Sequence, residues 1–356
     1  MQTKPVYLIL ENGTVFCGKS FGYEAETTGE IVFTTGMTGY MSTLTDTGYA
    51  GQIVVQTFPL IGNYGVVSHE CESKGTFLKA YISREFCQEP SNFRCEGALG
   101  VFLSENKIVG VSGIDTRKLT RILRDNGSMN ARITYELPEK LDSILAELKA
   151  YKAQNPITDV TCKEVWADEA NGGKKVVLWD LGASDSIKAA LTARGCSVIT
   201  VPASTTAEQI LEYKPDGVVI SNGPGCACDV PEIVAEATKL SDAGVPMLGI
   251  CLGHLVLGAA NGAKCVKLPH GHRGSMPSVR QADKRVFIAF QNQGYALDEA
   301  TLPESIKVTY KNGNDGTVEG VEYTDISAIG VQFRPSSVGG PNATDFIYDD
   351  FIGMMK

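Results

Sequence analysis

Histidine and tryptophan are scarce in this chain, which has four and two of them among its 356 residues. No Cys-x-x-Cys pair is present, and the close pairs Cys226-Ala-Cys228 and His69-Glu-Cys71 lack the spaced second pair that zinc sites use. We therefore expect no metal site. Lys and Arg number 32 against 41 Asp and Glu, and the net charge of −9 argues against a nucleic-acid-binding surface.

Long apolar runs are missing too. No stretch approaches the roughly 20 residues that cross a bilayer, and residues 1–13 pass from the start to an Asn-Gly turn too quickly for a signal peptide. A chain of this size without an export signal is expected to keep its ten cysteines reduced. These absences predict a cytoplasmic protein without a membrane partner, and a hydrophobic content of 43% is enough for two ordinary domains.

The patterning predicts an α/β protein of two domains. Residues 1–150 carry short β-rich runs between Gly- and Asn-containing turns and then an amphipathic helix, which predicts a smaller α+β domain. Residues 151–173 are polar and irregular, as expected of a linker. In residues 174–356 apolar runs alternate with helical patterns, which predicts a mostly parallel sheet flanked by helices. Ligands of such sheets bind beyond the carboxyl ends of the strands.

One apolar run leads into Gly249-Ile-Cys251-Leu-Gly253, and a helical pattern follows it. This is the strand–turn–helix order of a nucleophile elbow, with sulfur in place of the usual serine oxygen. The glycines suit a turn that brings neighbouring backbone too close for a Cβ. The first amides of the helix would stabilise a thiolate and later an oxyanion. Cys251 is therefore the candidate nucleophile, and the competing interpretation is a buried core cysteine.

A second glycine-containing loop, Ser221-Asn-Gly223-Pro-Gly225, follows another apolar run and precedes a helical pattern. Its glycine spacing lets backbone amides face a ligand, so it is a candidate for the other half of an oxyanion hole. A lone Gly-Pro-Gly loop is a weak signal. It gains weight because the cysteine elbow follows the next strand.

These two motifs, Asn222-Gly-Pro-Gly225 and Gly249-Ile-Cys-Leu-Gly-His254, resemble those of the class I, triad-type glutamine amidotransferases. The rest of the chain narrows the resemblance to the carbamoyl phosphate synthetase small-subunit family. The motifs that carry it are Gly36-Met-Thr-Gly-Tyr40, Pro59-Leu-Ile-Gly-Asn-Tyr-Gly65, Gly113-Ile-Asp-Thr-Arg-Lys-Leu-Thr-Arg121, Gly271-His-Arg-Gly274 and Gln291-Asn-Gln-Gly-Tyr-Ala-Leu-Asp298. The resemblance covers essentially the whole chain.

The resemblance implies that a cysteine thiolate attacks the side-chain amide of glutamine, that ammonia leaves, and that the thioester is hydrolysed to glutamate. Ammonia would pass through an internal tunnel to a large subunit, the implied partner, which would also hold ATP and Mg²⁺. No cofactor is expected in this chain. The amides of Leu252 and Gly225 would form the oxyanion hole. The family positions that line the glutamine site fall on Gly48, Gly223, Gly225, Leu252, Leu255, Asn292, Gly294 and Tyr295.

The chain departs from the family pattern within this same pocket. Where the family has His-Pro-Glu, this sequence has Arg334-Pro-Ser336, so an arginine and a serine occupy the positions of the general base and its orienting carboxylate. A glutamine that contacts substrate is replaced by Leu255, and the histidine of Gln-Asn-His-Gly is replaced by Gln293. A serine of the first domain that reaches the substrate is replaced by Gly48.

An arginine beside Cys251 would lower the pKa of the thiol, but it stays protonated and cannot pass a proton to departing ammonia. The loss of a positioned acid/base group costs about 10²–10⁴ in rate. We therefore expect a small subunit whose glutaminase activity is impaired or lost. Two alternatives stay open: a working glutaminase that uses His254, His272 or water as its base, and a non-catalytic binding or regulatory paralogue.

Overall fold

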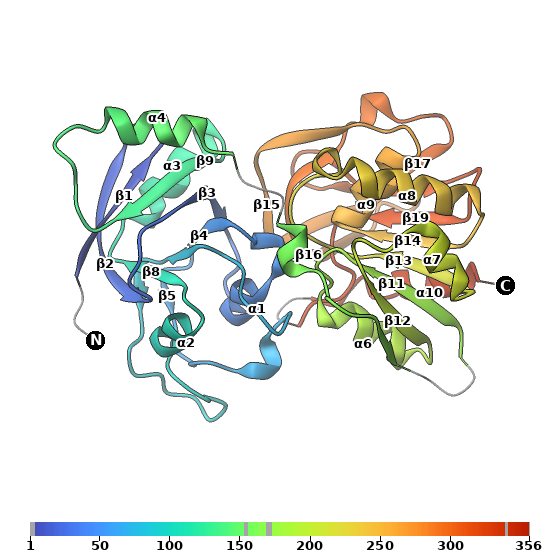
Figure 1. Ribbon diagram of the computed structural model, residues 1–356, viewed down its shortest axis with the longest axis horizontal. Helices are drawn as coiled ribbons and strands as arrows, with labels where there is room; N and C mark the ends of the chain where they lie inside the picture. Colours follow the sequence, from blue (N-terminus) through green and yellow to red (C-terminus); the bar gives the residue numbers. More distant parts are fainter. Residues whose placement is uncertain (1–3, 153–155, 169–172, 339–340, 356) are drawn as a thin grey trace. The chain divides into compact units, whose positions relative to one another are not determined.

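The computed structural model describes residues 4–152, 156–168, 173–338 and 341–355. The chain divides into two compact units, Met1–Gln154 and Asn155–Lys356, which run from blue to green and from green to red in Figure 1. Each hydrophobic cluster lies wholly within one unit, so each unit builds its own core.

The first unit is a closed β-barrel in the order β1-β2-β8-β6-β4-β3-β9. Its strands are β1 (Pro5–Leu10), β2 (Val15–Gly22), β3 (Thr27–Thr34), β4 (Gln52–Gln56), β6 (Ala80–Ile82), β8 (Val109–Ser112) and β9 (Met129–Thr134). The other elements are α1 (Tyr40–Thr45), η1 (Thr47–Tyr49), β5 (Leu60–Ile61), η2 (Ser68–Glu70), β7 (Glu85–Phe86), α2 (Leu99–Glu105), α3 (Thr116–Asn126) and α4 (Asp142–Ala150).

Alternation along the strands divides the core of this unit into two clusters. On β4, Ile53 and Val55 belong to a cluster that all seven barrel strands share, whereas Val54 packs with residues of α1 and α2. This is the period-two spacing of a strand buried on both faces. From α3, Leu119 and Leu123 join the shared cluster, because residues four apart lie on one helix face.

The second unit is built on a sheet and helices. Its strands are β10 (Trp166–Asp168), β11 (Lys175–Asp180), β12 (Ser197–Pro202), β13 (Gly217–Ile220), β14 (Met247–Ile250), β15 (Cys265–Arg280), β16 (Val286–Leu297), β17 (Ile306–Asn312), β18 (Val318–Tyr323) and β19 (Ala328–Val331). Its helices are α5 (Ile157–Val160), α6 (Asp185–Ala193), α7 (Ala207–Glu212), η3 (Ala227–Asp229), α8 (Pro231–Asp242), α9 (Leu252–Ala260), η4 (Glu299–Thr301) and α10 (Ile347–Gly353).

The sheet has ten strands in the order β10-β12-β11-β13-β14-β19-β18-β17-β15-β16. The part from β12 to β19 is parallel throughout. The strands beyond it on both sides are antiparallel. The carboxyl ends of the parallel strands meet at one edge, and in that part Ile250 of β14 lies beside Val331 of β19.

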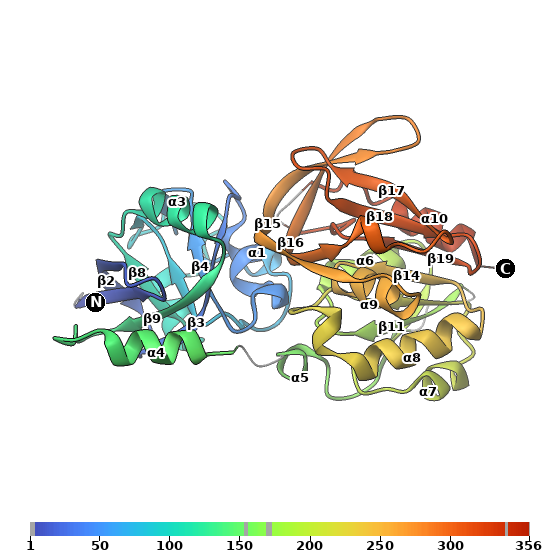
Figure 2. The same cartoon turned by 90° about the horizontal axis from the view of Figure 1, so that it is seen from above.

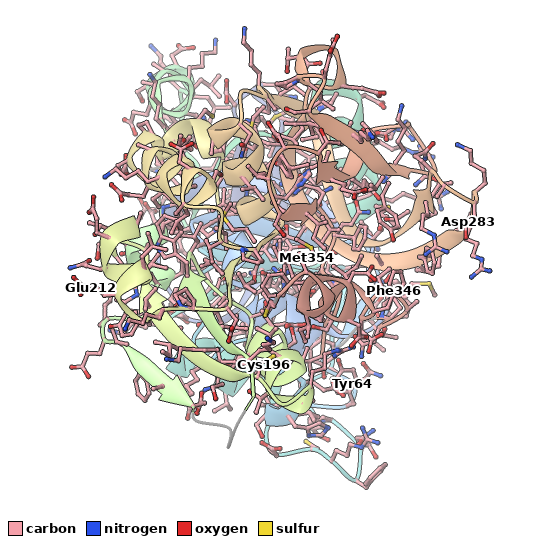
Figure 3. All side chains as sticks on the ribbon, turned by 90° about the vertical axis from the view of Figure 1, so that its right-hand side faces the viewer. Tyr64, Cys196, Glu212, Asp283, Phe346 and Met354 are labelled. Carbon is pink, nitrogen blue, oxygen red and sulfur yellow. The ribbon has the colours of Figure 1, made fainter. Side chains whose placement is uncertain are left out.

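Helices cover both faces of the parallel part. Val177 of β11 packs in the cluster with α7, α8 and α9, and its neighbour Leu178 packs in the cluster with α6 and α10. Successive side chains of a strand point to opposite faces, so these clusters are the two sides of a three-layer α/β/α arrangement. Figure 2 shows α7 and α8 together on one side of β11. Figure 3 faces α10, which is flanked by the labelled Phe346 and Met354.

The stretch 151–173, expected to be a linker, carries two elements of the second unit. Helix α5 buries Ile157 in the large cluster, and β10 pairs antiparallel with β12. Residues 153–155 and 169–172 of this stretch lie outside the described residues. Among the helices that are described, none is long and apolar enough to cross a membrane.

Candidate active site

Cys251 stands at a sharp turn between a strand and a helix. Strand β14 ends at Ile250 and α9 begins at Leu252, so Cys251 is the single residue between them. Its backbone has φ 55° and ψ −105°, a conformation that L-residues rarely adopt and that persists where the surroundings enforce it. Its N–H donates to the Val331 carbonyl at 2.8 Å. The strand–turn–helix order expected from the sequence is present, with the cysteine 4% exposed.

The two glycines of the elbow stand where no side chain fits. A Cβ on Gly249 would lie 2.6 Å from the carbonyl oxygen of Gly253, and a Cβ on Gly253 would lie 2.0 Å from that of Ile220. Both distances are far below van der Waals contact, so glycine is required at both positions. The Gly253 N–H donates to the Ser221 carbonyl at 3.0 Å. The elbow is thereby bound to the end of β13.

The loop after β13 lies against the elbow. A Cβ on Gly223 would lie 2.9 Å from Leu252 Cδ2, so these two candidate residues are neighbours. Gly225 has φ +86°, where glycine is favoured. Among the described residues, neither the Leu252 nor the Gly225 N–H donates to another backbone group, as oxyanion donors require. Asn222, which is buried, holds the loop by donating from Nδ2 to the Gly182 carbonyl at 2.9 Å.

Two polar groups of the second unit contact the sulfur. Cys251 Sγ donates to the Asn292 carbonyl at 3.6 Å, and Gln332 Nε2 lies 3.8 Å from Sγ. Gln332 is fully buried and follows Val331, the partner of Ile250 in the sheet. Gln332 lies in none of the motifs from which the site was predicted. The signal that could have found it is the parallel pairing of β14 with β19, which aligns the residues that follow the two strands.

Arg334 is buried and bound to strand β16. Its side chain is 1% exposed, and its backbone N–H donates to the Phe290 carbonyl at 2.9 Å. The guanidinium carbon lies 5.5 Å from the centroid of the Phe290 ring, a cation–π contact. Phe290 and Asn292 are two residues apart on the same strand. The strand that binds the arginine therefore also contacts the sulfur.

Ser336 belongs to a hydroxyl network. Its Oγ lies 2.9 Å from Tyr348 Oη and donates to the Ser186 carbonyl at 3.3 Å. In return Ser186 Oγ donates to the Ser336 carbonyl at 3.3 Å. The network ties α6 to α10.

The remaining candidate substrate positions lie in different surroundings. Leu255 is 2% exposed and packs within the large core cluster, against which the half-buried Tyr295 also packs. Gly294 is half-buried on β16. Gly48 belongs to the first unit, in η1, where its N–H donates to Asp46 Oδ1 at 2.7 Å.

His254 is fully buried one turn along α9 from the cysteine. Neither of its ring nitrogens forms a hydrogen bond within the described parts of the chain. The ring packs against Gly330, where an added Cβ would lie 2.6 Å from Nδ1. Burial lowers its pKa from 6.5 to about 3. An imidazole with so low a pKa binds a proton too weakly to act as an effective general base at neutral pH.

His272 belongs to a buried polar network around Glu319. Its Nε2 lies 2.9 Å from Asp315 Oδ2, and its Nδ1 lies 3.4 Å from Gln293 Nε2 and 3.3 Å from Asn312 Nδ2. Glu319 is fully buried and accepts from Asn312 Nδ2 at 2.6 Å. Burial raises the pKa of Glu319 above its usual range. Within the described residues, the hydrogen bonds of the His272 ring stay in this network and do not reach the nucleophile.

Comparison with known proteins assigns both units. Residues 8–133 match the family described as carbamoyl-phosphate synthase small chain, CPSase domain, and residues 177–354 match glutamine amidotransferase class-I. A carbamoyl phosphate synthase small chain of Clostridium perfringens (strain 13 / Type A) is 44% identical over 347 residues, which cover 97% of this chain and 98% of that one. The chain belongs to the carbamoyl phosphate synthase small chain family.

Two other small chains of carbamoyl phosphate synthase agree over a similar extent. That of Bacillus cereus is 43% identical over 98% of this chain and 95% of its own length. That of Lactococcus lactis subsp. lactis is 40% identical over 98% and 97%. The family resemblance and the α/β fold class inferred from the sequence are thereby confirmed.

In the amidotransferase domain of this small chain, the cysteine elbow and positions 334 and 336 differ in the groups that they offer. The Cys251 thiol stands at a strained elbow, and the Leu252 and Gly225 N–H groups donate to no other backbone group among the described residues. At positions 334 and 336 stand a guanidinium and a hydroxyl, neither of which changes its protonation state near neutral pH. The structure brings the elbow of Cys251 next to the loop of Gly223, whereas positions 334 and 336 carry an arginine and a serine.

Proposed function

We propose that this small chain assembles with the large subunit of carbamoyl phosphate synthase and that its own hydrolysis of glutamine is impaired. The large subunit would hold ATP and Mg²⁺ and would run on free ammonia. Identity of 44% over nearly the full length of a carbamoyl phosphate synthase small chain supports the partner. The proposal of impaired glutamine hydrolysis rests on the buried arginine at position 334.

The impairment concerns the departure of ammonia. Attack of the Cys251 thiolate on the glutamine amide gives a tetrahedral adduct, and its nitrogen must gain a proton before the C–N bond breaks. A guanidinium can stabilise the thiolate by its charge, but it does not give up a proton at usable pH. The expected loss is therefore about 10²–10⁴ in rate, the contribution of a positioned acid/base group.

The two histidines weighed as substitute bases do not compensate in this arrangement. His254 has a pKa of about 3 and packs against Gly330. His272 is hydrogen-bonded to Asp315 and faces the amides of Gln293 and Asn312. These surroundings favour an impaired site over a glutaminase that uses either ring.

The decisive experiment measures two reactions of the purified complex with its large subunit. We expect carbamoyl phosphate synthesis from ammonium to proceed and synthesis from glutamine to be slower by about 10²–10⁴. The Cys251→Ala variant should leave the ammonium reaction unchanged. Robust glutamate release that disappears in Cys251→Ala would overturn the impairment, and failure to bind the large subunit would contradict the partner.

Restoring the acid/base pair should restore hydrolysis. Arg334→His combined with Ser336→Glu is expected to raise glutamate release at least tenfold, because an imidazole and its orienting carboxylate contribute about 10²–10⁴ when well placed. Arg334→Gln with Ser336→Glu is the matched control, since it removes the guanidinium without adding a proton carrier. Absence of any gain, even with Leu255→Gln added, would mean that the pocket differs in more than these side chains.

A further inference from the structure

Two cysteines and an aspartate meet beside the loop that follows β13, and a third cysteine contacts one of them. The sulfurs of Cys226 and Cys228 and a carboxylate oxygen of Asp229 all lie within 4.8 Å of one another. Two sulfurs bound to one tetrahedral zinc ion, each at about 2.3 Å from it, lie about 3.8 Å apart. The three groups therefore need only small side-chain rotations to share one ion.

The third thiol comes from a distant part of the sequence. Cys265, the first residue of β15, lies within hydrogen-bond reach of the Cys226 thiol and is hydrogen-bonded to the backbone of Ala227. Cys-x-Cys alone is a weak pattern, and without a spaced second pair the sequence predicts no metal site. The fold supplies a third thiol that the sequence spacing does not reveal, because the first residue of β15 lies next to η3.

The short helix η3 already holds these groups in a fixed arrangement. The Cys228 N–H donates to Cys226 Sγ at 3.3 Å, and the Cys226 N–H donates to Asp229 Oδ2 at 3.2 Å. Backbone donors to sulfur stabilise the thiolate form that a metal binds. Cys226 is buried, Cys265 is half-buried and Cys228 is exposed. A bound ion would therefore be shielded on one side and could enter from solvent on the other.

The protonation of the thiols opposes binding but does not prevent it. Contact with Cys265 and then burial raise the pKa of Cys226, and burial and then Cys226 raise the pKa of Cys228 to about 12. The same contact lowers the pKa of Cys265. A metal replaces these protons, which pass to solvent as the metal–sulfur bonds form, so affinity must rise with pH.

We propose that Cys226, Cys228, Cys265 and Asp229 form a binding site for a thiophilic divalent cation, Zn²⁺ in the first place. Three thiolates and one carboxylate are a tetrahedral donor set of the kind that zinc accepts, and they suit Mg²⁺ or Ca²⁺ poorly. All four positions are filled by protein, so the ion is structural. It joins the loop after β13 to the first residue of β15.

Titration of the reduced, metal-free full-length chain with Co²⁺ tests the site, because cobalt bound by thiolates shows sulfur-to-metal charge-transfer absorption and tetrahedral d–d bands. We expect saturation at one equivalent, displacement by Zn²⁺, and an affinity that rises by about tenfold or more per pH unit. Cys228→Ser and Cys265→Ser should each weaken binding at least tenfold. Cys17→Ser, which removes an exposed thiol of the first unit, should leave it unchanged.

Two results would overturn the site. The first is the absence of a charge-transfer band, or a titration that is the same in Cys228→Ser and Cys265→Ser as in the parent chain. The second is a reduced chain that binds no Co²⁺ but loses the Cys226 and Cys265 thiols together on mild oxidation with glutathione disulfide. That outcome would make the cluster a dithiol pair. Cys228 is exposed, so its replacement by serine keeps the test independent of folding.

Discussion

At the scale of single residues, the imidazole of His254 is unusual because it is fully buried. Its two ring nitrogens are enclosed without a hydrogen-bond partner in the described residues, and an unsatisfied buried polar group costs about 1–3 kcal/mol. Gly330 leaves the ring its space. The ring is therefore a packed, neutral part of the core, and its environment ties the stability of the unit to pH.

Lowering the pH should destabilise the second unit through this residue. The pKa of His254 is about 3 in the folded chain and 6.5 ordinarily, so between these values the unfolded chain binds a proton that the folded chain does not. Above pH 6.5 the ring is neutral in both states, and protonation of His254 does not lower the free energy of unfolding. As the pH falls below 6.5 this free energy decreases, by about 2 kcal/mol at pH 5. His254→Leu should remove this part of the pH dependence.

Urea unfolding at about pH 7 and about pH 5, followed by tryptophan fluorescence, measures the effect, since Trp166 and Trp179 both lie in the second unit. His69→Leu, at an exposed position of the first unit, is the matched control. Equal pH dependence in the parent chain and in His254→Leu would contradict this account.

At the scale of elements, the elbow depends on the space that its glycines leave. Gly253→Ala places a Cβ 2.0 Å from a carbonyl oxygen of β13, and we expect a loss of more than about 3 kcal/mol because backbone must move. Gly353→Ala in α10 meets nothing within 4 Å and should stabilise by up to about 1 kcal/mol. Thermal unfolding of both variants compares them, and similar melting temperatures would contradict the role of the elbow.

The elements that the sequence predicts well follow local rules. The run up to Ile250 is apolar, glycines flank Cys251, and a helical pattern begins at Leu252, so strand, turn and helix are each visible within a few residues. The Gly223–Gly225 loop is found in the same way. Its contact with Leu252 then follows from the parallel order of β13 and β14.

Other elements depend on pairing that no short window shows. Strand β15 contains Pro269 and Pro277 together with Gly271 and Gly274, which all disfavour a strand, yet it pairs with β16 over most of its length. Closure of the barrel likewise needs contacts between strands far apart in the sequence. Gln332 lies at the sulfur for the same reason, since the alignment of β19 with β14 places it there.

At the scale of the whole molecule, the hydrophobic clusters divide between the units without sharing a member. Both tryptophans belong to the second unit, so tryptophan fluorescence reports on that unit alone. The two cores can therefore be perturbed and observed separately.

Truncation of a barrel residue should act on the first unit. Ile53 is fully buried in the cluster shared by all barrel strands, and Ile53→Ala is expected to cost about 2–5 kcal/mol. Amide hydrogen exchange should quicken across the barrel, while the transition reported by tryptophan stays unchanged. A tryptophan transition that shifts by the same free energy would show that both units unfold as one.

Arg334 is held to Phe290 by main-chain atoms on both sides. Such a bond does not depend on which side chain stands at position 334, so a different residue there inherits the same anchor on β16. A substitution at position 334 therefore changes the side chain there without removing the main-chain bond to β16. In evolution, a proton-carrying side chain could be lost or regained at this position without a change in the backbone conformation.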